Sequence, residues 1–205
     1  EDVEGFPSPE DDLRKLPFAA RAGFIFASID PIAPFGDFIN DAAVRLAAID
    51  PHGLRLAETR EYEFEAHWAL YCENYLEGFH IPFVHNSLNE ALDYSSYSTE
   101  LFTFSNLQLG ISKDSVGTFH LPADHSDFGK NISAYYYWIF PNLMFNFYPW
   151  GISINIIKPI RKDLTRVSFL SYVLDESKIE TGVGAGLDKV EREDEAIVEN
   201  VQRGI

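Results

Sequence analysis

Apolar and polar residues alternate along residues 54–66. Tyr62, Phe64 and Ala66 fall on one side of this segment, and glutamates occupy the positions between them. A period of two predicts a strand that has one solvated face. Similar patterns predict further strands over residues 20–29, 101–111, 134–140, 144–159 and 165–173. We expect the first of these to be short and buried, and the fourth to bend at Pro149–Gly151.

Three other segments repeat their apolar residues every three or four positions, which predicts helices over residues 38–48, 68–79 and 187–202. In the second, one apolar stripe predicts the core-facing side of a three-turn helix; it consists of Trp68, Tyr71, Cys72, Tyr75, Leu76 and Phe79. Residues 112–131 contain glycine and proline among polar residues, and they predict a long excursion on the surface or over a site. The sum predicts an α+β fold, in which an antiparallel sheet carries helices packed on it.

The composition fits one globular domain and excludes several classes of partner. The 205 residues include 32 acidic and 16 basic side chains, giving a net charge of −16, and no run is rich in lysine or arginine. Nucleic-acid binding and a polybasic membrane anchor both need clustered cations and are therefore excluded. The single cysteine, Cys72, excludes an internal disulfide and any iron–sulfur cluster held by two or more cysteines of this chain. Without an apolar run of about 18 residues or a leader segment, we expect a soluble, cytoplasmic protein with no membrane partner.

Two histidines close the second predicted helix. Glu73, Glu77 and His80 share one side of it, and Pro82 is expected to kink the chain so that the rings of His80 and His85 turn toward one point. The alternative is a solvated acidic face with surface or capping histidines. His120 and His125 have the same spacing in the loop-like segment, so the spacing alone does not identify a site.

The last predicted helix carries one acidic residue within its apolar side. On a helical wheel, Asp194 lies among an apolar arc of about 100° that contains Leu187, Val190, Ile197, Val198 and Val201. The four glutamates of this helix, Glu191, Glu193, Glu195 and Glu199, are predicted to lie outside that arc. A buried carboxylate is costly unless something such as a cation neutralises it, although an aspartate at the rim of the core or bonded to backbone groups would also explain it. Two histidines and one carboxylate are a ligand set for iron(II) with open positions, and zinc accepts the same donors.

The run ENYLEGFHIPFVH, residues 73–85, resembles the motif E-N-x-x-[DE]-x-[YF]-H-x4-H of Rieske-type ring-hydroxylating oxygenase α subunits. Residues 23–34, 137–149 and 193–204 are similar to other blocks of that family in the same order. The resemblance implies a helix-grip catalytic domain with a mononuclear Fe(2+) held by His80, His85 and Asp194. Glu77 stands where the family bridges electrons from the Rieske cluster of a neighbouring subunit, which implies a homotrimer. Glu77 and the motif residue Asn74 are the candidate catalytic residues.

The resemblance also sets the expected domain limits and electron donors. Residues 1–205 are one catalytic domain, in which residues 1–35 resemble the segment after a Rieske domain and residues 36–205 bind the iron. With one cysteine, the chain lacks the cysteine pairs of a Rieske [2Fe–2S] centre, so this centre and a reductase must supply electrons from outside these residues. We therefore expect the isolated segment to be inactive. Glutamate at position 77 occurs in the subgroup that includes choline-type monooxygenases.

The substrate is expected to be a small organic molecule that reacts with dioxygen. The aromatic run 135–150 predicts a pocket wall for an aromatic ring or a quaternary ammonium group, and the candidate residues are Tyr137, Phe140, Phe145 and Phe147. Burial in the core is the alternative explanation of these aromatic residues. Two other functions stay open at this point: a helix-grip module that binds a small ligand without redox activity, and a zinc hydrolase with Glu77 as its base.

Overall fold

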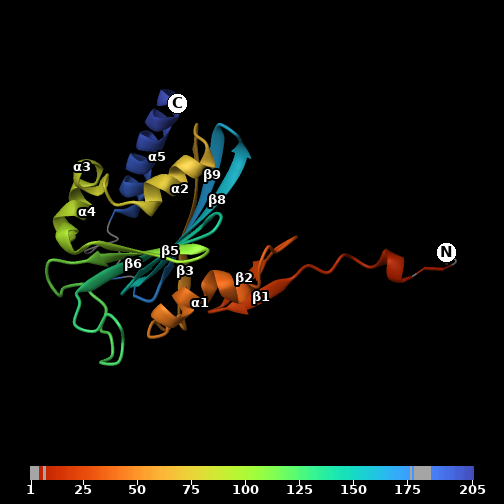
Figure 1. The fold of residues 1–205 in the computed structure, drawn as a ribbon, viewed down its shortest axis with the longest axis horizontal. Coiled ribbons are helices and arrows are strands. Elements are labelled where there is room, and N and C mark those ends of the chain that lie inside the picture. The colour runs from red at the N-terminus through yellow and green to blue at the C-terminus, as the bar shows by residue number, and fades with distance from the viewer. Residues whose placement is uncertain (1–4, 7, 176, 178–185) are drawn as a thin grey trace.

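A seven-stranded antiparallel sheet forms the centre of the computed structural model, which describes residues 5–6, 8–175, 177 and 186–205 (Figure 1). The strand order is β3-β9-β8-β7-β6-β5-β4, so the first strand pairs with the last. The strands are β3 (Arg55–Phe64), β4 (Ser98–Leu101), β5 (Ser105–Ile111), β6 (Ile132–Ile139), β7 (Leu143–Tyr148), β8 (Gly151–Arg161) and β9 (Leu164–Val173).

Helices pack against this sheet from two sides. On one side lie α2 (Trp68–Leu76) and the long α5 (Leu187–Gly204), with the short helices α3 (Ile81–Val84) and α4 (Asn86–Ala91) beside them (Figure 1). The short 3-10 helix η2 (Tyr94–Ser96) leads from α4 into β4. On the other side lies α1 (Phe35–Arg45), which packs on β5 and β6. A long C-terminal helix on an antiparallel sheet is the helix-grip arrangement, so the predicted α+β fold is confirmed.

The alternating segments form strands much as their patterns predict. In β3 the side chains of Tyr62 and Phe64 are buried, as is Ala66 just beyond it, while the glutamates between them are exposed. Two of the predicted strands are in fact hairpins. Residues 101–111 divide between β4 and β5, and the expected bend at Pro149–Gly151 is a tight turn that reverses the chain from β7 into β8.

The N-terminal apolar run is not one buried strand. Past the short 3-10 helix η1 (Pro9–Asp11), it forms an exposed two-stranded hairpin of β1 (Phe18–Arg21) and β2 (Phe24–Ala27). The two residues at its turn, Ala22 and Gly23, both have positive φ, as two-residue hairpin loops require. The prediction was wrong because the apolar residues before and after this turn pair with each other.

The segment of residues 112–131 runs along the surface on the α1 side of the sheet. The Nε2 atom of His125 lies 2.8 Å from the carbonyl oxygen of Arg45, and the hydroxyl of Tyr135 donates to Asp127. The predicted helix at residues 38–48 begins earlier, directly after Pro34, and α1 ends at Arg45. Among the described residues, every helix is too short or too polar to be a transmembrane span.

Gly151 provides a test of the strand packing, because it opens β8 against the backbone of β9. A Cβ atom at this position would lie 2.1 Å from the carbonyl oxygen of Tyr172. We expect Gly151→Ala to lower the free energy of unfolding by about 2 kcal/mol or more, since backbone must move. Gly204→Ala, near the end of α5 where an added Cβ meets nothing within 4 Å, is the control. Equal urea midpoints for the two variants would contradict this packing.

Candidate metal centre

The helix that carries the first motif residues ends earlier than its apolar stripe predicts. α2 ends at Leu76, and Glu77 already has extended backbone angles (φ −129°, ψ 159°). Gly78 follows, where a Cβ atom would lie 2.9 Å from the ring of Tyr97. This close approach turns the chain away from the helix axis, and Phe79 is consequently 77% exposed instead of lying on the core-facing stripe.

Pro82 begins a helical turn and does not kink one. It lies in the first turn of α3, where the missing N–H of proline costs no hydrogen bond. The predicted kink at Pro82 was therefore wrong, and the break lies at Glu77 and Gly78. His80 precedes the single turn of α3 and His85 follows it, so the centroids of their rings are 5.0 Å apart.

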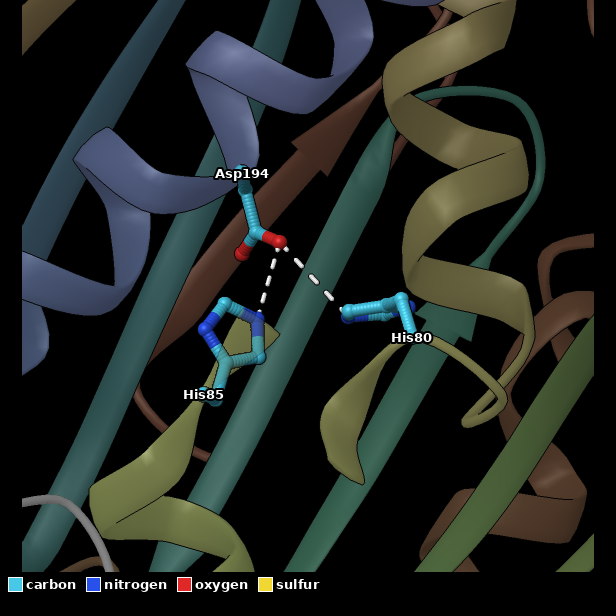
Figure 2. Close-up of side chains that lie close together, drawn as sticks. All are labelled: His80, His85 and Asp194. Atoms are coloured by element: carbon cyan, nitrogen blue, oxygen red, sulfur yellow. Dashed lines mark hydrogen bonds and ion pairs between the residues drawn. The ribbon is translucent and has the colours of Figure 1, made fainter. Parts of the chain in front are cut away.

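Asp194 meets the two histidines from α5 (Figure 2). Its Oδ1 atom lies 3.0 Å from Nε2 of His85 and 3.6 Å from Nε2 of His80. One donor atom from each of the three side chains lies within 4.8 Å of the others. His85 is 1% exposed, and the side chains of His80 and Asp194 are each 15% exposed.

The other nitrogen of each ring contacts a second carboxylate. Oε1 of Glu77 lies 2.6 Å from Nδ1 of His80, and Oε2 of Glu193 lies 2.8 Å from Nδ1 of His85. A carboxylate accepts a hydrogen bond here, so each Nδ1 carries a proton, and Nε2 is the ring nitrogen that faces Asp194. Asn74 holds that aspartate in place, since its Nδ2 donates to Oδ1 over 2.7 Å.

This donor set fits a divalent cation. The lone pairs of the two Nε2 atoms, one on each histidine, and the carboxylate oxygen of Asp194 repel one another unless a proton or a metal ion lies between them. Two donors that each lie about 2.1 Å from one ion are separated by about 3 to 4 Å, which matches the Nε2–Oδ1 distances of the three residues. Burial alone would lower the pKa of His85, but the carboxylates of Asp194 and Glu193 raise it above its ordinary value. The site thus attracts positive charge.

A second carboxylate on the buried side of α5 corrects the helical-wheel prediction. Glu191 is only 8% exposed, and it accepts hydrogen bonds from the hydroxyl of Tyr71 and from Nδ2 of Asn155. Burial, together with the charge of Asp194, raises the pKa of Glu191 to about 7. On an ideal helix Glu191 lies about 20° from Val198, so a slightly wider arc would have included it.

A cavity of about 90 Å³ adjoins the three residues and is lined from the sheet and from α2 and α5. Besides them, the side chains that line it include Tyr75, Tyr97, Tyr136, Tyr148, Phe169 and Glu191. The four predicted pocket residues do not line it. Tyr137, Phe145 and Phe147 line a separate cavity under α1, on the opposite face of the sheet, and Phe140 follows β6 at a more exposed position. Alternate residues of β6 and β7 face opposite sides, so these side chains do not border the three-residue site, and their role in a substrate wall stays a prediction.

Comparisons with known proteins agree on one protein family. Residues 51–205 match the model of the ring hydroxylating alpha subunit (catalytic domain). The chain is 33% identical over 153 residues to choline monooxygenase, chloroplastic, from Arabidopsis thaliana; the match covers 71% of this chain and 34% of the relative. It is 25% identical over 216 residues to the carnitine monooxygenase oxygenase subunit of Escherichia coli K12, covering 100% of this chain and 56% of the relative.

Solved structures agree with these relatives. A quaternary ammonium Rieske monooxygenase, described in connection with carnitine oxidation and inter-subunit electron transfer, has a TM-score of 0.74 at 25% identity and covers 98% of this chain and 55% of its own. Naphthalene 1,2-dioxygenase with bound indole has a TM-score of 0.66 at 19% identity, covering 92% and 52%, and supports the fold alone. The chain therefore spans between a third and just over half of the proteins that it resembles.

Glu191 gives the site a pH dependence that unfolding can measure. In the metal-free chain its folded pKa of about 7 exceeds the ordinary value of 4.5, so its contribution to stability is fully present below pH 4.5 and is lost as the pH rises through 7. We expect Glu191→Gln, which does not titrate, to gain up to about 3 kcal/mol relative to the unmodified chain over this interval.

Urea unfolding at several pH values between about 5 and 8 measures this difference. The same substitution at the exposed Glu73 of α2 is the control for losing one negative charge. A difference between Glu191→Gln and the unmodified chain that is constant over the whole pH interval would show that Glu191 ionises in the folded state as readily as in the unfolded state.

Proposed function

Because the chain belongs to the family of ring-hydroxylating oxygenase α subunits, we propose that it is the catalytic domain of a Rieske-type oxygenase and that His80, His85 and Asp194 hold its mononuclear iron. The observation that carries this assignment is the convergence of two Nε2 atoms and one carboxylate oxygen within 4.8 Å. Iron(II) held by two histidines and one carboxylate supplies the activation of dioxygen, since three protein ligands leave positions open for it.

The neighbouring polar residues of the chain hold these three side chains in position. Glu77 and Glu193 each accept a hydrogen bond from Nδ1 of one histidine, which fixes the rings with Nε2 toward the site. Asn74 belongs to this set through its hydrogen bond to Asp194, which links α2 to α5. The assignment gives residues 36–205 to the iron-binding part and residues 1–35 to the segment that follows a Rieske domain.

Electrons must come from outside these 205 residues. A Rieske [2Fe–2S] centre needs two cysteines, whereas the sequence has only Cys72, which is buried in α2. We assign to Glu77 the transfer of electrons from the Rieske centre of a neighbouring subunit in a homotrimer, with a reductase as the first donor. Two observations support this role: the carboxylate of Glu77 contacts His80 at the metal site, and its side chain is 34% exposed and so is accessible from the surface.

The substrate that we assign is a small quaternary ammonium compound. Relatives named for choline and for carnitine support this choice over an aromatic ring. So does the cavity of about 90 Å³ beside the three ligands, which is lined by four tyrosines. The face of a tyrosine ring attracts a quaternary ammonium group, which offers no hydrogen-bond donors of its own. Hydroxylation next to the nitrogen is the reaction that this placement favours.

The ligand assignment predicts the iron content of two histidine variants. We expect His80→Ala to lower iron affinity by more than about a hundredfold, because even residues that only orient a ligand typically change affinity 10- to 100-fold. His120→Ala removes an exposed histidine of the H-x4-H pair in the surface segment and should leave iron binding unchanged. Iron titration of anaerobically purified protein, with circular dichroism to check folding, measures both. Stoichiometric iron in His80→Ala would refute the assignment.

The electron-transfer assignment predicts a different defect for Glu77→Gln. The amide keeps a hydrogen-bond acceptor for His80, so we expect iron content to stay nearly intact in the complete protein, while turnover stops because electrons arrive slowly. Single-turnover mixing of a pre-reduced Rieske centre with substrate and dioxygen measures the rate of Rieske reoxidation. Glu73→Gln, an exposed glutamate of α2, is the matched control. Reoxidation of the Glu77→Gln protein at the unmodified rate would leave Glu77 with only an orienting role.

A further inference from the structure

Glu191 is a buried carboxylate without a cationic partner in the described part of the chain. No lysine, arginine or histidine there forms an ion pair with it, whereas Asp188, on the same helix, pairs with both Arg60 and Arg192. The fully buried Asp127 likewise pairs with Arg45 and Lys130. Burying an unpaired negative charge costs several kcal/mol, so most proteins supply a counter-ion or avoid the arrangement.

The position of Glu191 shows where a counter-ion would fit. Its side chain lines the same cavity as the three proposed iron ligands, together with Tyr75, Tyr136 and Tyr148. Asp194 also lines this cavity, and its negative charge acts on Glu191 and raises the pKa of that carboxyl. A positive group placed here would lie beside aromatic side chains and the buried carboxylate of Glu191, and charges attract more strongly in a partly buried site than in water.

We propose that Glu191 is the counter-ion that selects a cationic substrate, a role that rests on the quaternary ammonium substrate assigned above. Each oxygen of Glu191 already accepts a hydrogen bond, one from Tyr71 and one from Asn155. These two bonds use part of the acceptor capacity of the carboxylate and leave less of it for the three N–H bonds of a primary ammonium group, whereas a quaternary ammonium group needs only the charge. Glu191 therefore favours the quaternary ion over a protonated amine as well as over a neutral molecule of the same shape.

The test compares two ligands that differ only in charge. Choline and its neutral carbon isostere, 3,3-dimethylbutan-1-ol, are titrated calorimetrically into the full-length, iron-loaded protein at a pH of about 8, where Glu191 is ionised. We expect the unmodified protein to prefer choline, and Glu191→Gln to reduce this preference by about tenfold or more. Binding of the neutral isostere should not change. Glu195→Gln, one turn further along α5 and outside the cavity lining, is the charge-matched control and should keep the preference.

The outcomes separate this role from the assigned substrate class. If the unmodified protein does not prefer choline over the isostere, the quaternary ammonium substrate is wrong and the role of Glu191 falls with it. If it does and Glu191→Gln keeps that preference, or if Glu195→Gln loses it equally, only the role of Glu191 is overturned. Glu191→Asp retains the charge and should retain the preference, and it serves if the glutamine variant fails to fold. Loss of the preference in this aspartate variant would also overturn the role, because charge alone would not suffice.

Discussion

The site depends on two carboxylates, Glu191 and Asp194, that lie between α5, α2 and the sheet and form no ion pair with a lysine or arginine of the described structure. α5 brings Glu191, Glu193 and Asp194 to its inner side within two turns. Lys189 pairs with Glu193 at the edge of this group, and Arg60 and Arg192 pair with Asp188, but none of them pairs with Glu191 or Asp194. Because like charges repel strongly where they are poorly hydrated, this arrangement lowers the stability of the metal-free folded protein. The same repulsion favours the binding of cations. The Nδ1–H groups of the two histidines give Glu77 and Glu193 hydrogen bonds but no balancing charge, and a metal ion and a cationic ligand are suited to supply it.

Much of this arrangement follows from residue patterns, and the failures have identifiable physical causes. The alternation around Tyr62 and the apolar arc around Asp194 correctly predict which side chains point into the protein. In both elements one face is buried and the other is solvated. The end of α2 at Leu76 depends instead on Gly78 meeting Tyr97, a contact between segments that no local pattern contains. Pro82 is compatible with either a kink or a first helical turn, and only the earlier break selects the second. For Glu191, the arc was taken too narrowly for a helix that packs on both α2 and the sheet.

The sequence cannot tell which aromatic residues border the three-residue site, because the central strands are buried on both faces. None of the eight positions of β6, from Ile132 to Ile139, is exposed, so hydrophobicity cannot tell which alternate set faces α1 and which faces the site. Tyr137 and Phe145 pack in the apolar layer under α1, whereas Tyr136 and Tyr148 face the other way. Both sets are equally aromatic, and only the polar residues next to them distinguish the two faces.

Those polar residues also explain how the sheet positions the site. Asn106, Gln108, Asn146, Ser153 and Asn155 occupy one face of β5, β7 and β8, yet all of them are buried. A pattern that normally marks a solvated face here marks the face that receives the helices. Gln108 donates to the carbonyl of Tyr75, Tyr75 donates to Asn146, and Asn155 donates to Glu191. Burying polar groups is costly unless they are bonded, so these three hydrogen bonds favour the observed placement of α2 and α5 on the sheet. That placement brings Asp194 to the two histidines, and it explains why strands with a polar face contribute to the site without supplying a ligand.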